Sequence, residues 1–327
     1  MNEKSFPSNG ADICRHGLVA IALAVTSSFL FAAPVASAAS RVVAWGDMNY
    51  YINVGPLKPG VGVIQIASGD FHSLTLQNDG SVAAWGDNTF GQTSVPALVK
   101  RNRVVQIAAG NVHSVALLAN GTVVAWGQST GQFGDYNQDD VPAKLSGVVE
   151  IAAGAAHSLA LKRDGTVVAW GFGMFGQCAV PQGLNRVISV AGGMYHSLAL
   201  RSDGTVVAWG DNSQGQCAVP AGLNHVIAIA AGGMHSLALK SDGTVVFWGT
   251  YGLMQGGVPQ GLNGVVAIST GDYHSLALKR DGSVVAWGMD DASECNLPAN
   301  AGKVLAISAR GDHNMVLVNG VATTASR

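Results

Sequence analysis

Seven of the nine histidines recur along the chain at intervals of 39 to 44 residues. Imidazole rings can bind metals or exchange protons near neutral pH. A metal ion, however, needs several ring nitrogens at about 2.0–2.1 Å, and seven equivalent positions spread over separate repeats cannot supply them. We therefore predict no metal site, and we expect each histidine to be a structural residue that hydrogen-bonds a neighbouring backbone group. The seven residues are His72, His113, His157, His196, His235, His274 and His313.

Three of the four cysteines occupy one position in different repeats. Cys178, Cys217 and Cys295 each stand three residues before a proline. Equivalent positions on separate units are usually further apart than the roughly 4.4–6.8 Å between Cα atoms that a disulfide requires. We predict three small, half-buried side chains rather than a disulfide or a zinc site.

A calcium loop is suggested by Asp135, Asn137 and Asp139, which lie in the only substantial insertion, residues 128–140. The sixth position of such a loop should be Gly and the twelfth Glu, but this chain has Asp140 and Ser146 there. We therefore favour a solvated acidic loop over a calcium site.

The strands that position these residues can be predicted from a second repeated motif, which has the same spacing as the histidines. All seven tryptophans lie in an (A/F)-W-G motif, again 39 to 44 residues apart. Within each repeat, β-branched runs flank tight turns such as Asp242-Gly243, which favour hairpins. A period of about 40 residues with four short strands is typical of a propeller blade. We predict an all-β fold, a seven-bladed β-propeller of four-stranded antiparallel blades, with the tryptophans packed between blades.

The two ends of the repeat region are complementary. Residues 41–46 carry a W-G strand without the strands that normally precede it, and residues 304–320 carry the first two strands without a W-G strand. We therefore predict that the N-terminal strands join the C-terminal blade and close the ring.

The first 38 residues have the features of a secretory signal peptide. Lys4 and Arg15 precede an apolar run, residues 18–33, and Ala36-Ser37-Ala38 forms a small-residue cleavage site. A retained membrane anchor is the alternative, but the run is shorter than the roughly 20 residues a span needs. We predict a signal peptide over residues 1–38 and one propeller domain over residues 39–327. The mature protein would be periplasmic or extracellular, without membrane attachment.

Composition limits the function further. The chain has 18 basic and 20 acidic residues, a net charge of -2 and only 12% charged residues. Without a basic run, nucleic-acid binding by phosphate neutralisation is not expected, and the balance of charge argues against a dominant electrostatic partner. No catalytic arrangement or phosphate-binding loop departs from the repeat pattern. We expect no enzyme activity, no cofactor and a monomer.

Segments such as IAAGGMHSLALKSDGTVVFWG and GDNTFGQTSVP resemble the repeats of the regulator of chromosome condensation (RCC1) family. The resemblance covers essentially the whole mature chain and implies a seven-bladed propeller. The short blades and the export signal are most similar to the family's secreted bacterial branch, which includes an inhibitor protein of β-lactamase. This resemblance implies a rigid scaffold that binds another protein through loops on one rim, although one fold hosts many functions.

Function is expected where the repeats differ. Because strands alternate in direction, the loop before each histidine and the loop after each W-G motif emerge on the same face. These loops are rich in aromatic and methionine residues, the composition of a protein-binding surface. About half of these side chains should fold inward, especially Phe90 and Phe175. The candidate partner-binding residues are Phe71, Tyr195, Met234, Tyr273, Tyr50, Tyr51, Phe133, Tyr136, Phe172 and Tyr251.

A polar cluster is expected at the mouth of the central channel. Arg310 takes the place of a glycine that precedes the histidine by three residues in other repeats, and Asp312, Asp70 and Asp272 should lie close to it. A structural ion-pair cluster is one interpretation. A pocket for a small ligand or for catalysis is the other.

The leading hypothesis is an exported propeller that binds a protein partner, with inhibition of a secreted or periplasmic enzyme such as a β-lactamase as the candidate role. The alternative is a propeller enzyme or small-ligand binder at the channel mouth. Guanine-nucleotide exchange and chromatin binding, which the resemblance to eukaryotic family members implies, conflict with the signal peptide and with the missing basic patch.

Overall fold

The structure is a computed structural model that describes residues 40–46, 54–55, 57–127, 136–250, 257–299 and 301–319. In these ranges the chain forms strands and one short helix, α1 (Ala97–Arg101). No helix in the described part is long and apolar enough to cross a membrane. The predicted signal peptide, residues 1–38, lies outside the described residues, so it stays a prediction.

Seven antiparallel sheets follow one another along the chain, each with a first, a second and a third strand. The first strands are β2 (Val63–Ser68), β5 (Val104–Ala109), β8 (Val148–Ala153), β11 (Val187–Gly192), β14 (Val226–Ala231), β17 (Val265–Thr270) and β20 (Val304–Arg310). The second strands, each beginning with a repeated histidine, are β3 (His72–Gln77), β6 (His113–Leu118), β9 (His157–Lys162), β12 (His196–Arg201), β15 (His235–Lys240), β18 (His274–Lys279) and β21 (His313–Val318). The third strands, which carry the tryptophans, are β1 (Arg41–Gly46), β4 (Val82–Gly86), β7 (Val123–Gly127), β10 (Val167–Gly171), β13 (Val206–Gly210), β16 (Val245–Gly249) and β19 (Val284–Gly288).

Each sheet has three strands in the described residues, and not the four that we predicted. The segment expected to form the fourth strand contains short turns that lead into a proline, as in residues 211–220. Proline has no backbone N–H to donate to a ladder, and tight turns do not present the alternating donors and acceptors of a strand. This segment instead contributes single backbone carbonyl groups to the neighbouring sheet, as described below.

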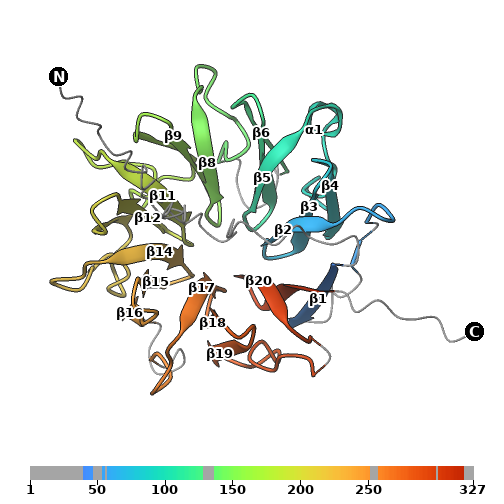
Figure 1. Cartoon of the computed structure of the whole chain (residues 1–327). Helices are drawn as coiled ribbons and strands as arrows, with labels where there is room; N and C mark the ends of the chain where they lie inside the picture. Colours follow the sequence, from blue (N-terminus) through green and yellow to red (C-terminus); the bar gives the residue numbers. More distant parts are fainter. Residues whose placement is uncertain are drawn as a thin grey trace, which may run out of the picture.

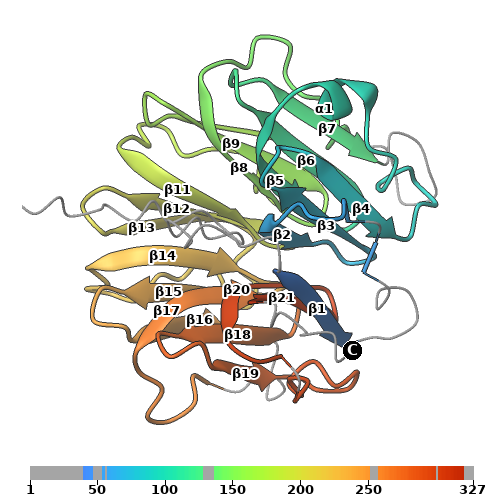
Figure 2. The same ribbon diagram turned by 45° about the vertical axis from the view of Figure 1, so that its right-hand side comes forward.

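The seven sheets form a ring, with their first strands packed on one another around the centre (Figure 1). The contacts between first strands run from β2 through β5, β8, β11, β14 and β17 to β20, and β20 in turn contacts β2. Strand β1 pairs with β21 from Arg41↔Val318 to Gly46↔His313, so the two ends of the chain share one sheet. In the view turned by 45°, neighbouring sheets lie face to face along the ring (Figure 2).

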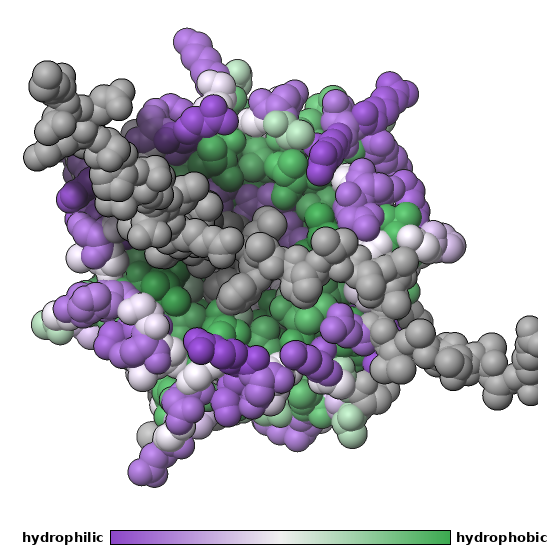
Figure 3. Space-filling model, viewed as in Figure 1, coloured by the Kyte–Doolittle hydropathy of each residue, from purple (hydrophilic) through white to green (hydrophobic). Residues whose placement is uncertain are grey.

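The hydrophobic core lies between neighbouring sheets. Trp126 of β7, for example, packs with Leu74 of β3 and Ile107 of β5. The repeated tryptophans are only 6–7% exposed. Burying such large rings against a neighbouring sheet stabilises the ring of sheets, which confirms that the tryptophans pack between blades. On the face drawn in Figure 3, hydrophobic side chains gather toward the centre and hydrophilic ones toward the rim.

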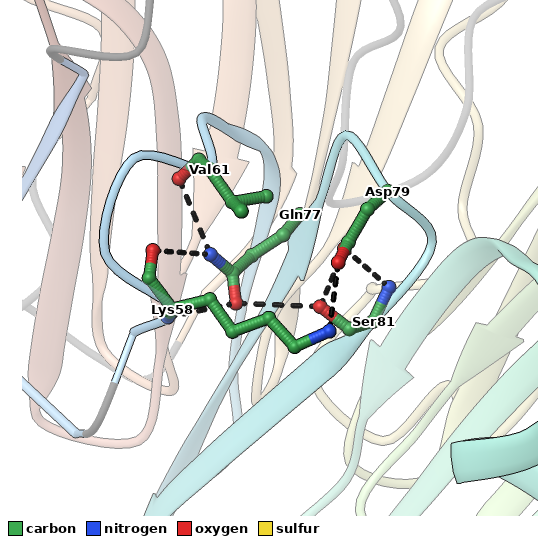
Figure 4. Close-up of polar contacts among 5 residues, drawn as sticks. All are labelled: Lys58, Val61, Gln77, Asp79 and Ser81. Atoms are coloured by element: carbon green, nitrogen blue, oxygen red, sulfur yellow. Dashed lines mark hydrogen bonds and ion pairs between the residues drawn. The ribbon is translucent and has the colours of Figure 1, made fainter.

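The hairpins between second and third strands form the end of the propeller that is called the hairpin face below. In the first sheet, Asp79 Oδ1 accepts hydrogen bonds from Ser81 N (2.9 Å) and Ser81 Oγ (2.5 Å), and Lys58 Nζ lies 2.8 Å from Asp79 Oδ2 (Figure 4). Gln77 Nε2 donates to Val61 O at 3.2 Å, which ties the entering chain to the sheet. Gly80 has a φ of +83°, a conformation that favours glycine.

Candidate functional site

The seven repeated histidines connect neighbouring sheets around the whole ring. In each case Nε2 lies 2.7–3.2 Å from a side-chain oxygen on the next second strand, a serine hydroxyl in six cases and the Asn314 amide in one. We expected backbone partners. Nε2 of each ring instead contacts a side chain, while His72 also has a backbone hydrogen bond with Asn111. The residue directly after each histidine, a serine in six repeats and Asn314 in the last, faces the preceding sheet, so its side chain reaches the imidazole of the repeat before it. The pairs are His72–Ser114, His113–Ser158, His157–Ser197, His196–Ser236, His235–Ser275, His274–Asn314 and His313–Ser73.

A short relay fixes the direction of these hydrogen bonds. Ser158 Oγ donates to the backbone oxygen of Gln138 at 3.0 Å, so this hydroxyl accepts from the N–H of His113. The indole N–H of Trp170 donates to the same Gln138 oxygen at 3.0 Å. Burial lowers the pKa of His113 to about 3, so the ring is neutral at physiological pH. The histidines are therefore structural, with neither exposure nor a suitable pKa for acid–base chemistry.

The carbonyl acceptors in this relay were not found by the sequence reasoning. Each acceptor is the backbone oxygen of a buried residue after a third strand. That residue is either the glutamine of a Gly-Gln step or the residue at the equivalent position of another repeat. The recurring glutamine was the available signal, although the backbone oxygen rather than the amide takes part. The acceptors are Gln92, Gln138, Gln177, Gln216 and Glu294.

Arg310 extends from the end of β20 across the centre of the ring. Its guanidinium donates from Nη1 to the backbone oxygens of Gly192 (3.2 Å) and Ala153 (3.4 Å) and from Nη2 to Asn111 Oδ1 (3.2 Å). Its Nε lies 3.4 Å from Asp70 Oδ1, and both side chains are at most 10% exposed. One side chain thus joins the last sheet to the first four.

The carboxylates predicted near Arg310 have different environments. Burial raises the pKa of Asp70 well above its ordinary value and the nearby Asp272 raises it further, while Arg310 opposes the shift. Burial likewise raises the pKa of Asp272. Asp312, in contrast, is exposed. Beside Arg310 is a cavity of about 20 Å³, lined by small residues of the first strands, which has room for about one water molecule.

The loops before the second strands and the turns after the third strands lie together on one end of the propeller, opposite the hairpin face. In the first sheet Asp87 N donates to Phe71 O at 2.8 Å, and in the fourth Asp211 N donates to Tyr195 O at 2.9 Å. These backbone hydrogen bonds join the two kinds of segment that the sequence predicted to be neighbours. This end is called the aromatic face below.

A groove of about 590 Å³ opens on the aromatic face over the first four sheets. Four of the predicted partner-binding residues, Phe71, Tyr136, Phe172 and Tyr195, line it. Phe71 is 44% exposed, and the other three are half-buried. The remaining lining residues are Asp70, Asp87, Thr89, Phe90, Asn111, Val112, Ala155 and Ala156.

One wall of the groove is a cluster of aromatic rings. The ring centroid of Phe172 lies 4.5 Å from that of Tyr136 and 6.0 Å from that of Tyr195, and Phe175 lies 4.8 Å from Tyr195. Such tilted arrangements hold rings in place. Phe175 is 48% exposed, so the expectation that it folds inward was wrong.

Two other predicted binding residues, Met234 and Tyr273, do not line this groove. Met234 and Tyr273 occupy the corresponding positions before the second strands β15 and β18, where both are half-buried. The remaining four, Tyr50, Tyr51, Phe133 and Tyr251, lie outside the described residues.

The other candidate chemistry is not assembled in the described part of the chain. Cys178, Cys217 and Cys295 are free and half-buried. No group of three or more potential metal ligands occurs in the described ranges. Asp135 of the suggested calcium loop lies outside them.

The fold and repeats define a seven-bladed β-propeller built from sequence repeats. The family model of the regulator of chromosome condensation (RCC1) repeat matches residues 63–92, 104–134, 148–177, 187–216 and 265–293. The chain therefore belongs to the RCC1 repeat family. No curated protein sequence matches the chain.

Solved structures share the fold at low sequence identity. Prp20p from Saccharomyces cerevisiae, described with its binding to Gsp1p and histones, superimposes with a TM-score of 0.75 at 22% identity, covering 89% of this chain and 93% of Prp20p. The yeast RCC1 protein (Prp20) bound to Kap60 gives 0.74 at 21%, covering 99% and 96%. Human WBSCR16 gives 0.69 at 21%, covering 86% and 99%.

Proposed function

We propose that this chain is a binding scaffold that holds another protein on its aromatic face. The observation that carries the proposal is the groove of about 590 Å³, whose walls are exposed or half-buried aromatic side chains on a rigid ring. Aromatic anchors in concave surroundings contribute most of the binding energy at protein interfaces. A standard interface buries about 800 Å² on each partner, and a groove with its surrounding loops can provide that area.

The rigidity of the scaffold supports this function. Each blade is joined to the next by a His–Ser or His–Asn hydrogen bond and by a buried tryptophan, so the loops are presented on a nearly fixed base. A preorganised surface binds more tightly because little conformational entropy is lost on association.

The residues at the channel mouth give less support to the alternative, an enzyme or small-ligand site. Arg310 uses its guanidinium on three oxygen atoms of the protein itself, and the neighbouring cavity is the size of a water molecule. A substrate or small ligand would have to displace these contacts. We therefore place binding at the aromatic groove and not at Arg310.

Family members are described with protein partners: Prp20p with Gsp1p and histones, and yeast RCC1 with Kap60. These descriptions support protein binding as the class of function. For this chain we propose an exported protein, because of the signal-like residues 1–38, and an extracytoplasmic partner. Inhibition of a secreted or periplasmic enzyme such as a β-lactamase is the specific role that we propose for this binding.

The test is affinity capture from the periplasm and culture medium of the source cell with the purified protein as bait. The test variant carries Phe71→Ala with Tyr195→Ala, which removes anchors from two sides of the groove. The control variant carries Arg186→Ala with Lys240→Ala on the hairpin face. We expect one enriched protein that the test variant loses and the control retains. Equal capture by both variants would contradict the proposed face.

If the captured protein is an enzyme, its turnover is measured with increasing amounts of the bait. Inhibition that saturates at one equivalent, and that disappears with the Phe71→Ala/Tyr195→Ala variant, is the expected result. Full activity of the enzyme in the complex would refute the inhibitory role while leaving the binding role in place.

A further inference from the structure

Basic residues gather at one end of the propeller, although the net charge of the chain is only -2, whereas acidic residues occur at both ends. In the described ranges, Arg310, the last residue of β20, is the one lysine or arginine at the aromatic face. The others lie at the opposite strand ends, in the hairpins, or in the links that lead there. Acidic residues, in contrast, stand on the aromatic face in several sheets. They include Asp70, Asp87, Asp211, Asp272, Asp290, Asp291 and Asp312.

Arg310 does not offset this acidity where a partner would bind. It is 6% exposed, and its terminal nitrogens are directed at Gly192 O, Ala153 O and Asn111 Oδ1. The balanced composition predicted no dominant electrostatic partner. Composition does not show, however, how charges are distributed over the two faces.

The groove itself carries two of the acidic groups. Asp70 and Asp87 line it together with the aromatic side chains, and no lysine or arginine does. Asp87 is half-buried and accepts hydrogen bonds from Thr89 N (3.0 Å) and Gln92 Nε2 (3.0 Å). Hydrogen bonds lower its pKa against the effect of burial, so it stays ionised at neutral pH.

We propose that the groove receives a lysine or arginine side chain of the partner, flanked by apolar residues. The cation would lie against the aromatic rings, which attract positive charge through their π faces, with Asp87 as the ionised counter-group. The apolar neighbours would cover the exposed parts of Phe71 and Phe175. This inference rests on the proposed function and adds the chemistry of the partner: a basic, apolar surface segment.

Two probe peptides test the inference: acetyl-Leu-Lys-Leu-amide, and the same peptide with norleucine in place of the lysine, which lacks only the ammonium group. Binding to the purified protein is measured by NMR titration at low ionic strength. We expect the lysine peptide to bind about ten-fold more tightly, and added salt to reduce this preference because it screens the charges.

Asp87→Asn should remove the preference for the lysine peptide. Asp211→Asn is the matched control, since Asp211 accepts the corresponding hydrogen bonds from Ser213 N (3.0 Å) and Gln216 Nε2 (2.8 Å) but does not line the groove. We expect the preference to survive in this control. A preference that persists in Asp87→Asn, or equal loss in both variants, would overturn the inference.

A third variant separates this inference from the proposed function. Tyr195→Ala should weaken the binding of both peptides, because it removes an aromatic wall of the groove. If both peptides bind equally and both are weakened by Tyr195→Ala, the groove remains a binding surface and the cationic partner is refuted. If Tyr195→Ala leaves both affinities unchanged, the groove is not the binding site and both proposals fail.

Discussion

Replacing Arg310 by methionine should destabilise the propeller more than any exposed charge substitution. Methionine keeps an unbranched apolar stem but is shorter and cannot donate to Gly192 O, Ala153 O or Asn111 Oδ1. It also leaves Asp70 and Asp272 buried without their cation. Removing one partner of a buried, hydrogen-bonded ion pair costs about 3–5 kcal/mol of unfolding free energy. We expect a loss in that range at pH 8.

The loss should depend on pH. Burial and mutual repulsion already raise the folded-state pKa of Asp70 above its ordinary value, and Arg310 opposes that rise. Without the guanidinium the pKa rises further. A carboxyl group with a raised folded pKa favours the folded state less as pH increases from its unfolded pKa through its folded pKa. The difference between wild type and Arg310→Met should therefore be smaller at pH 5, where these carboxyl groups can remain protonated, than at pH 8.

The assay is urea unfolding, followed by far-UV circular dichroism at both pH values. Arg186→Met is the control, because Arg186 pairs with Asp203 at 3.4 Å but is 66% exposed, and such surface pairs contribute at most about 1 kcal/mol. Adding Asp70→Asn to Arg310→Met should recover about 1–3 kcal/mol. An Arg310→Met variant as stable as Arg186→Met at pH 8 would refute the view that Arg310 joins the sheets.

Three further predictions concern the ring and its thiols. Burial lowers the pKa values of the seven ring histidines to about 3 or 4. Below pH 6.5 the unfolded chain therefore binds more protons than the folded chain, and the free energy of unfolding should fall by up to about 10 kcal/mol per pH unit toward pH 4. Equal urea midpoints at pH 7 and pH 5 would contradict this. Gly154→Ala would place a Cβ against the His157 ring and 2.7 Å from Gly193 O, so thermal unfolding should show a loss of about 1–3 kcal/mol in unfolding free energy. Gly257→Ala is the control and should change little, because a Cβ there would lie in open space. Similar melting temperatures for the two variants would refute the close packing. Burial raises the pKa of Cys178 and Cys295 to about 11 and that of Cys217 to about 12. A thiol reagent at pH 8 should therefore modify all three cysteines much faster in urea than in the native protein. Rapid modification of the native protein would contradict this.

The ring of sheets could be predicted from the sequence because the same residue types occupy the same structural positions in each repeat. The spacing of tryptophan and histidine gave the number of sheets and their strand order. The serine after each histidine was also a usable signal, since Ser114 and Ser158 stand in the same place in the repeat, but its partner lies in a different sheet. Pairing between repeats depends on the curvature of the ring, which no single repeat encodes.

The candidate site was less predictable because it depends on differences between neighbouring loops. The groove forms where Tyr136, Phe172 and Tyr195 from three successive segments meet, and sequence alone does not show which loops face one another. The hydrogen bonds of Arg310 to other sheets form only because the centre of the ring is narrow enough for one side chain to cross it. The near-absence of basic residues from the aromatic face likewise appears only when strand direction assigns each loop to a face.

Hydrogen–deuterium exchange on the complex with the captured partner tests the central claim most directly. Binding at the aromatic face predicts slower exchange in residues 87–92, 172–177 and 194–195, which form or border the groove. Exchange in the hairpins at residues 79–81, 164–166 and 203–205 should stay unchanged. Protection confined to those hairpins, with the groove segments unaffected, would contradict the account.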